Sequence, residues 1–260
     1  EKVFTNQIAN DTLNGLVLHS NLTWQQITIL QTYRNYYSQI NPQYTHAKIN
    51  ATLLKHPKNT LALVHYFEEK FTLDTSKKDI KHRLKYSLPK QERHFQDLLI
   101  NVDEISEDII LKRLFNLIHH TLRTNFYCQT EKNAIAIKLN SPEIKLPLPV
   151  PYREIFVNNH ELEGIHLRFG PVSRGGLRWS NRPEDFRKEI LDLVKTQQTK
   201  NVVIVPVGSK GGFVIKKETN SREELAKESE IQYKKFIQSL LSVTDNLFLF
   251  LSGLFIAKPQ

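Results

Sequence analysis

The chain has 260 residues, 40% of them hydrophobic and 24% charged, and it carries a formal net charge of +9 at pH 7. This length and apolar content are sufficient to bury a core in one or two domains. The single cysteine, Cys128, excludes an internal disulfide and favours the reducing cytoplasm as the location. The sequence starts at Glu1, has no methionine and shows no signal peptide, which predicts an excerpt or a trimmed product.

The first part of the chain, up to about residue 128, has the apolar periodicity of helices. Thr23 and Gln26 have the spacing of a capping box that starts one helix. Ser106 is predicted to start another, with an apolar face formed by Ile109, Ile110, Leu114, Leu117 and Ile118. His119 and His120 on that helix are adjacent and point in different directions, unlike the i, i+4 pairs that bind one metal ion. No metal site is therefore predicted.

Strands replace helices from about residue 134. They are predicted at residues 134–139, 154–157, 164–168, 202–207 and 213–216. One further helix is predicted from Pro183 to residue 199, and a last one is capped by Ser221 and Glu224 and ends near residue 242. The expected fold class is α+β with an α/β segment: a helical N-terminal region (1–133), then a mixed sheet with flanking helices (134–246), then an apolar tail (247–260). No Rossmann domain is expected.

The most informative stretch of the sequence lies between residues 174 and 213. Gly175 and Gly176 follow Arg174, and glycines at positions 208, 211 and 212 surround Lys210. Glycines permit tight turns and allow a ligand to approach the backbone closely. Because Lys210 follows the apolar run 202–207, we expect it in a turn at the end of a buried strand, where open α/β sheets bind their ligands.

Three cations, Arg174, Lys200 and Lys210, are expected to converge at this turn. Such a trio suits a small dicarboxylate, because two cations can hold the two carboxylates while the third faces the reacting carbon. A lysine that is crowded by like charges and partly desolvated binds its proton less tightly, and it can act as an acid or base near neutral pH. The alternative is that these are ordinary surface cations among the 36 lysines and arginines. The neighbouring glycines favour a site.

Two nucleotide-binding motifs are absent from the sequence. The Walker motif requires a lysine directly after its second glycine and another glycine five positions before that one. Here Ser209 separates Gly208 from Lys210, and position 203 is valine. No G-x-G-x-x-G occurs in the 260 residues, so the chain has no dinucleotide fingerprint either.

Two long blocks, RGGLRWSNRPEDFR at residues 174–187 and KNVVIVPVGSKGGF at residues 200–213, carry a resemblance to a known family. They are similar to corresponding blocks of the NAD-specific glutamate dehydrogenases of the large bacterial class. Shorter segments at 53–57, 122–127, 154–157 and 164–168 also resemble that family, and the likeness covers roughly residues 3 to 246. It implies that residues 134–246 form a substrate-binding segment with a catalytic motif.

The resemblance implies oxidative deamination of L-glutamate to 2-oxoglutarate and ammonia, with NAD as the cofactor. It implies that Lys210 is the catalytic lysine, which polarises the carbonyl or imine and positions water. It assigns substrate binding to Lys200 and to Arg174, with Gly175 and Gly176. It also implies a homo-oligomer for the full-length enzyme. NAD would be bound by a domain that is not present in this chain, so we expect a fragment that is inactive alone.

Two other functions are weighed against this one. The net charge and the basic run at 77–85 allow a basic nucleic-acid-binding module, but no zinc-finger, RNP-like or K-homology pattern is present, and a solvated helix face explains the run. Tyr33, Tyr36 and Tyr37 have helical spacing and are expected in a core.

The second alternative is a non-catalytic remnant of a truncated gene. The apolar run 247–257 is shorter than the roughly 20 residues of a membrane helix and is an aggregation liability. Neither nucleic acid nor a membrane is therefore an expected partner.

Overall fold

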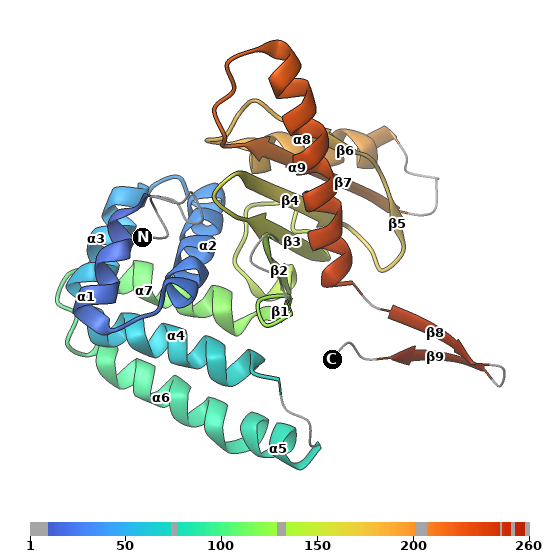
Figure 1. Cartoon of the computed structure of the whole chain (residues 1–260). Helices are drawn as coiled ribbons and strands as arrows, with labels where there is room; N and C mark the ends of the chain where they lie inside the picture. Colours follow the sequence, from blue (N-terminus) through green and yellow to red (C-terminus); the bar gives the residue numbers. More distant parts are fainter. Residues whose placement is uncertain are drawn as a thin grey trace.

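The computed structural model describes residues 10–73, 77–128, 134–200, 207–244, 246–250 and 253–257. N-terminal helices pack against a mixed seven-stranded sheet, and two further helices flank that sheet (Figure 1). The predicted fold class is confirmed: helices come first along the chain, and a mixed sheet with flanking helices follows.

The N-terminal part is built from short and medium-length helices. They are η1 (Thr12–Gly15), α1 (Leu16–Ser20), α2 (Trp24–Ile40), α3 (His46–Lys55), α4 (Pro57–Phe71), α5 (Lys77–His82), η2 (Arg83–Ser87), α6 (Leu88–Leu99) and α7 (Ile105–His119). α2 begins at the predicted capping box. The Thr23 hydroxyl accepts a hydrogen bond from the Gln26 amide, and the Gln26 side chain accepts one from the Thr23 amide.

α7 departs from the prediction at two positions. It begins at Ile105 with Glu104 as its capping residue, so Ser106 does not start the helix. The Ser106 hydroxyl instead donates to the Glu104 side chain. Ile109, which was assigned to the apolar face, is 43% exposed, whereas the other four residues of that face are buried. The helix was therefore predicted correctly, but its start and one edge of its buried face were not.

The strands form one mixed sheet and a separate hairpin. The sheet contains β1 (Thr121–Thr124), β2 (Ile135–Leu139), β3 (Arg153–Asn158), β4 (Leu162–Arg168), β5 (Ser173–Arg174), β6 (Leu177–Trp179) and β7 (Val207–Ile215), and the short 3₁₀ helix η3 (Ser141–Glu143) follows β2. β1, β2, β3, β4 and β7 are antiparallel neighbours in that order, and β5 and β6 pair with β7 in parallel. The helical structure expected up to about residue 128 is wrong at β1, where the Thr121 hydroxyl donates to the last turn of α7 and the chain then pairs with β2.

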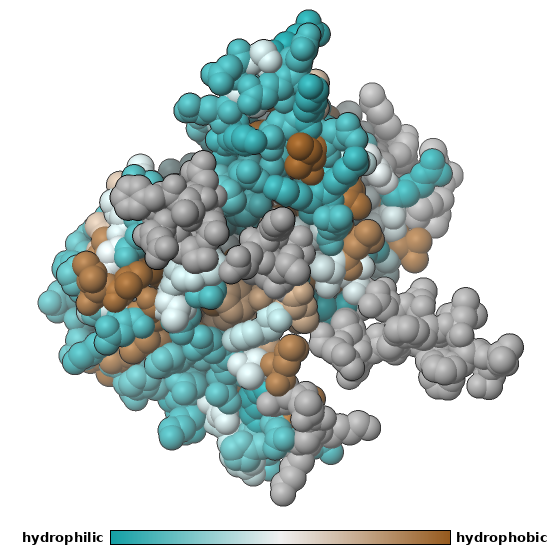
Figure 2. Space-filling model, in the orientation of Figure 1, coloured by the Kyte–Doolittle hydropathy of each residue, from teal (hydrophilic) through white to brown (hydrophobic). Residues whose placement is uncertain are grey.

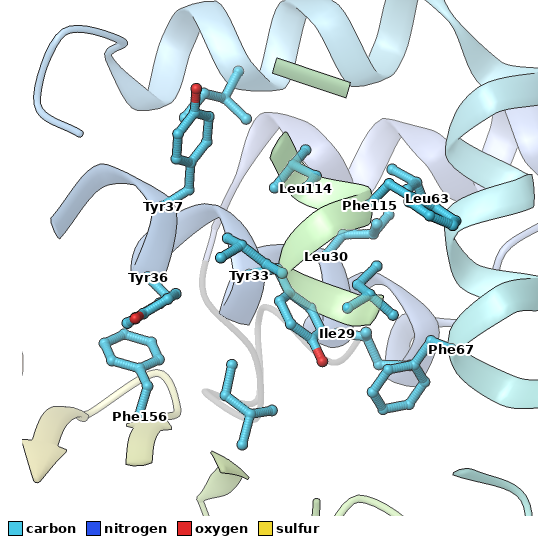
Figure 3. Packing of buried hydrophobic residues seen from close by; sticks show 14 of the residues in the cluster. Ile29, Leu30, Tyr33, Tyr36, Tyr37, Leu63, Phe67, Leu114, Phe115 and Phe156 are labelled. Atoms are coloured by element: carbon cyan, nitrogen blue, oxygen red, sulfur yellow. The ribbon is translucent and has the colours of Figure 1, made fainter. Parts of the chain in front are cut away.

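One hydrophobic core joins the helices to the sheet, and α2 contributes many of its side chains (Figure 3). Tyr33, Tyr36 and Tyr37 are buried there, as predicted. The Tyr36 ring packs against Phe156 of β3 with the ring centroids 5.3 Å apart. The Tyr33 hydroxyl oxygen lies 2.8 Å from the Thr121 hydroxyl oxygen of β1. The N-terminal helices and the sheet therefore share one apolar interior, while α9 (Arg222–Ser242) packs on a separate buried cluster.

The helices α8 (Phe186–Lys200) and α9 (Arg222–Ser242) lie on opposite faces of the sheet, with α9 in front of the strands in Figure 1. In β7, Gly212 packs against Ile190 of α8. The next residue, Phe213, packs against Phe236 of α9 with ring centroids 5.8 Å apart. Because successive residues of a strand point to opposite faces, these two contacts define an α8 face and an α9 face of the sheet.

The two flanking helices differ in how well their starts were predicted. α9 begins at the predicted cap, where the Ser221 hydroxyl accepts a hydrogen bond from the Glu224 amide. α8 begins at Phe186 and not at Pro183, because the first helical hydrogen bond is accepted by the Asp185 carbonyl. Pro183 lies in the preceding turn.

The C-terminal stretch forms β8 (Asn246–Phe250) and β9 (Gly253–Ala257), which pair only with each other among the described strands. Aggregation through this stretch stays a prediction.

Within the described ranges, no helix has both the length and the apolar character needed to cross a membrane. Figure 2 shows predominantly hydrophilic outer surfaces over α6 and α9. Lys81 and Lys85 of the basic run are exposed, as expected of a solvated face.

Candidate functional site

Lys210 lies inside a strand and not in a turn. β7 is continuous from Val207 to Ile215, and its ladder with β4 extends from Ser209 to Ile215, so the glycines around Lys210 are strand residues. The predicted turn at a strand end is therefore wrong, and the separate strand predicted at 213–216 is the second half of β7. Residues 201–206, most of the strand predicted before Lys210, lie outside the described residues.

The glycines of this region permit close packing of protein atoms. A Cβ atom at Gly211 would lie 2.3 Å from a leucine side chain of β6, and one at Gly212 would lie 2.4 Å from Ile190 of α8. A Cβ atom at Gly175 would lie 1.5 Å from the carbonyl oxygen of Ser209. Glycine inside a strand often marks such a close approach. At these three positions the space is occupied by the protein itself.

We expect Gly175→Ala to separate the segment 173–180 from β7 and to lower the free energy of unfolding by about 3 kcal/mol, because a backbone carbonyl of a central strand cannot move aside. Gly176→Ala is the matched control, since a Cβ atom there has no heavy atom within 4 Å. Its expected effect is within about 0.5 kcal/mol. Urea denaturation of both variants measures the difference, and equal stability would contradict the close packing at Gly175.

Arg174 and Lys210 lie on the same face of the sheet. Arg174 of β5 pairs with Gly208 of β7, two residues before Lys210. Directly paired residues and residues two apart on one strand share a face. This is the α8 face, because Gly212 on the same side of β7 contacts α8. Lys210 is half-buried opposite Leu167 of β4, and Arg174 is exposed. The backbone thus brings these two predicted site cations onto neighbouring strands.

The other predicted substrate-binding residues lie next to them in the chain or in the fold. Gly175 and Gly176 connect β5 to β6, and the Gly176 carbonyl accepts a hydrogen bond of 3.2 Å from the Gly211 amide. Lys200 is the last residue of α8, the helix that packs along β7. The Lys200 side chain lies outside the described residues, so its convergence with Arg174 stays a prediction.

Three polar residues that the sequence analysis did not identify connect this segment to α8. Glu189 of α8 accepts a hydrogen bond of 2.6 Å from the Ser180 hydroxyl and pairs with Arg178 of β6 at 3.2 Å. Arg178 is in register with Gly212 and therefore lies on the same face of the sheet as Lys210. Glu189 is nine residues after Ser180, and the two belong to different parts of the fold, since Ser180 follows β6 and Glu189 lies in α8. No local sequence pattern predicts such a contact.

A buried ion pair fixes α8 to the sheet. Arg187 of α8 donates two hydrogen bonds, of 2.7 and 2.9 Å, to the carboxylate of Glu154 in β3. Both side chains are at most 3% exposed. Burial lowers the pKa of Arg187, but the charge and hydrogen bonds of Glu154 outweigh burial and move the pKa upward. The guanidinium group therefore stays charged, and this bidentate pair holds the start of α8 over β3.

His166 lies on the opposite face of the sheet from Lys210. It is in register with Gly211, the neighbour of Lys210 in β7, and so points to the α9 face. Burial, with a smaller contribution from the charge of Arg168, lowers the pKa of His166 to about 4. The imidazole is therefore neutral at pH 7 and is not placed to exchange a proton with a ligand beside Lys210.

Two polar cavities, of about 400 and 290 Å³, lie among the N-terminal helices. The larger includes His65 and Arg83, and the smaller includes His119 and His120. His119 Nδ1 lies 2.8 Å from the Tyr66 hydroxyl, a contact inside the helical core. In the part of the chain that the structure describes, no group of three or more His, Cys, Asp or Glu side chains could hold a metal ion.

Comparison with known families accounts for most of these elements. A family model described as "Bacterial NAD-glutamate dehydrogenase, catalytic domain" matches residues 94–251, which include α7, the whole seven-stranded sheet, α8 and α9. This chain belongs to that family. A second model, "Glutamate dehydrogenase, helical motif 3", matches residues 8–73, which include α1 to α4. The family match extends past residue 246, where the likeness was expected to end.

Several curated relatives named NAD-specific glutamate dehydrogenase are similar to this member of the family. The protein of Halomonas elongata is 42% identical over 254 residues, that of Pseudomonas aeruginosa 44% over 245, and that of Mycobacterium tuberculosis 40% over 258. These alignments cover 95%, 92% and 94% of this chain, respectively. The chain spans only about 15% of the length of these relatives.

Proposed function

We propose that this chain forms the substrate-binding part of an NAD-dependent glutamate dehydrogenase, which converts L-glutamate to 2-oxoglutarate and ammonia. Family membership supports the reaction class. The structural observation that carries the proposal is the placement of Lys210 and Arg174 on neighbouring strands of one sheet face. Two cations on one face suit a ligand with two carboxylates, and a Cβ atom at Gly176 beside them would have no heavy atom within 4 Å.

Lys210 is the proposed catalytic residue. It is half-buried in β7, and within the described part of the chain its ammonium has no hydrogen-bonding or ionic partner. An ammonium group in this place can polarise the carbonyl or imine bond of the reacting carbon, because it stabilises negative charge on the oxygen or nitrogen atom. It can also hold or release a proton at Nζ. These two properties are what deamination and hydrolysis of the imine require of the protein.

Arg174 and Lys200 are the proposed carboxylate ligands. A guanidinium group can bind one carboxylate through two N–H groups, which fixes the orientation of the substrate as well as its position. Gly175 brings the strand of Arg174 against Ser209, and Gly176 leaves open space on the surface beside it. Both glycines therefore belong to the proposed substrate site, although in different ways.

The described residues do not fit a dinucleotide. The spaces beside Gly211 and Gly212 are filled by side chains. The described ranges also contain no glycine-rich turn between a strand and a helix N-terminus, where a pyrophosphate group would bind. We therefore place NAD binding in another part of the longer enzyme and expect no glutamate-dependent NADH formation by this chain alone. By the same family membership, we propose a cytoplasmic homo-oligomer for the longer enzyme.

Titration of the purified chain with 2-oxoglutarate by isothermal calorimetry tests the proposed site. We expect weak binding, and we expect Arg174→Gln to weaken it at least about tenfold, because a hydrogen-bonded charge contact contributes about 1.5–3 kcal/mol. The control is Lys188→Gln, which removes an exposed cation of α8 and should bind 2-oxoglutarate as the unchanged chain does. In the longer enzyme the Arg174 variant should raise KM more than it lowers kcat, since the contact serves binding.

The two alternative functions predict different results, one in this titration and the other in a titration with nucleic acid. A folded chain that binds neither glutamate nor 2-oxoglutarate would contradict the proposed site and favour a non-catalytic remnant. Binding of DNA or RNA that weakens steeply with salt would favour a nucleic-acid-binding module. Equal binding of 2-oxoglutarate by the Arg174 and Lys188 variants would contradict the assignment of Arg174.

A further inference from the structure

The segment that carries Arg174 has few backbone contacts with the rest of the sheet. β5 contributes two residues and β6 three, and between them the Gly176 carbonyl accepts one hydrogen bond from the Gly211 amide of β7. Both strands lie at the edge of the sheet. The segment has a paired neighbour on one side only, so side-chain contacts add to the backbone pairing that keeps it in place.

Glu189 supplies those side-chain contacts. Its Oε2 accepts the hydrogen bond from Ser180, and its Oε1 lies 3.2 Å from Arg178 Nη2. The Glu189 side chain is only 14% exposed. Ser180 is 3% exposed, and its amide donates a 2.8 Å hydrogen bond to the carbonyl of Phe213 in β7. The Glu189 carboxylate thus contacts both Arg178 of β6 and Ser180 at the end of the segment.

α8 gives Glu189 a fixed position. Two residues before it, Arg187 forms the buried ion pair with Glu154 of β3. One residue after it, Ile190 packs on the backbone of Gly212 in β7. Glu189 therefore connects an edge segment with few backbone contacts to a helix that is attached to two central strands, and one of these strands carries Lys210.

We propose that Glu189 is a positioning residue that sets the separation of Arg174 from Lys210 and thereby the length of the dicarboxylate that binds between them. This inference rests on the proposed function. Arg174 is four residues before Arg178 on the segment that Glu189 holds, whereas Lys210 is on β7. A displacement of the segment along β7 changes the distance between the two cations without changing either charge, so it alters selectivity for ligand length.

The test compares succinate, glutarate and adipate, which have four, five and six carbons, as competitors of 2-oxoglutarate in ligand-observed NMR with the full 260-residue chain. The unchanged chain should prefer glutarate. Glu189→Gln retains an acceptor for the Ser180 hydroxyl but loses the charge that holds Arg178. We expect the preference for glutarate over the other two acids to fall by about threefold, because the lost ion pair has a half-exposed partner and such pairs contribute little.

Glu184→Gln is the matched control, because Glu184 is an exposed carboxylate in the turn before α8. It should leave the preference unchanged. A merely structural role of Glu189 would weaken all three acids by the same factor, and an unchanged preference in Glu189→Gln would overturn the inference. If Glu189→Gln does not fold, Arg178→Gln breaks the same ion pair by changing its half-exposed member. The preference of the Arg178 variant among the three acids then tests the inference. Failure of the unchanged chain to bind any of these acids or 2-oxoglutarate would instead contradict the proposed function.

Discussion

Lys210→Ala, made in the longer enzyme that contains this chain, should lower kcat by at least about three orders of magnitude. The change removes a proton carrier and a positive charge together. Positioned acid–base groups contribute about 10²–10⁴ in rate, and preorganised charge contributes about 10²–10³. Steady-state kinetics with glutamate and NAD measures the effect. KM should change less than kcat, because the proposed role of Lys210 concerns the reacting carbon more than the carboxylates.

Two further variants make this experiment specific. Lys188→Ala removes an exposed lysine of α8 and should leave kcat within a factor of about two, as for a surface substitution. Lys210→Arg keeps the charge but cannot release a proton near neutral pH. It therefore separates the electrostatic contribution from proton transfer. A nearly normal kcat in Lys210→Ala would show that the catalytic assignment is wrong, although the chain belongs to the family.

Arg187→Ala should lower the free energy of unfolding by about 3–5 kcal/mol, the usual effect of breaking a buried ion pair. The Glu154 side chain is 0% exposed, so its carboxylate would remain buried without a counter-charge. The loss should appear as a lower midpoint of chemical denaturation with an unchanged slope. It should also weaken 2-oxoglutarate binding, because α8 would no longer be held over the sheet.

The matched control for this variant is Arg182→Ala. Arg182 pairs with Asp185 at the surface, where its side chain is 54% exposed. Exposed pairs contribute at most about 1 kcal/mol, so a small effect is expected. Similar losses of stability in the Arg182 and Arg187 variants would contradict the role of the buried pair in holding α8.

The features that the sequence predicted correctly depend on residues close together in the chain. The capping box of α2 requires only Thr23 and Gln26, and the cap of α9 only Ser221 and Glu224. The burial of three tyrosines in α2 follows from helical spacing. Within such short distances, the backbone geometry of one helix determines the contact, so no knowledge of the tertiary structure is needed.

The glycines around Lys210 were misinterpreted for a physical reason. A position that tolerates no Cβ atom arises either where the backbone turns or where another part of the protein lies against it. The sequence does not distinguish these causes. At Gly211 and Gly212 the second cause applies, because side chains of β6 and α8 occupy the space. Lys210 was nevertheless identified as a candidate, because of the glycines around it and the resemblance of this block to the dehydrogenase family.

Contacts between distant residues could not be predicted from the sequence. Glu154 and Arg187 are 33 residues apart, and each resembles the many other charged residues of the chain until the sheet and α8 are in place. The same holds for Glu189 and its two partners. β1 was missed because its four residues directly follow a helix, and the partner strand that stabilises it lies beyond the next loop.

The packing of α2 determines how this chain loses its structure. Asn35 of α2 donates a 2.6 Å hydrogen bond to Glu163 of β4, 128 residues later, and Tyr33 lies against Thr121, 88 residues later. Helices α1 to α4 match one family model, and α7 and the strands match another. The two parts share one hydrophobic core, so neither can unfold without exposing apolar surface of the other. Amide protons of α2 and of the central strands should therefore exchange with solvent in a single cooperative opening. The parts that match two different family models are thus expected to unfold as one thermodynamic unit.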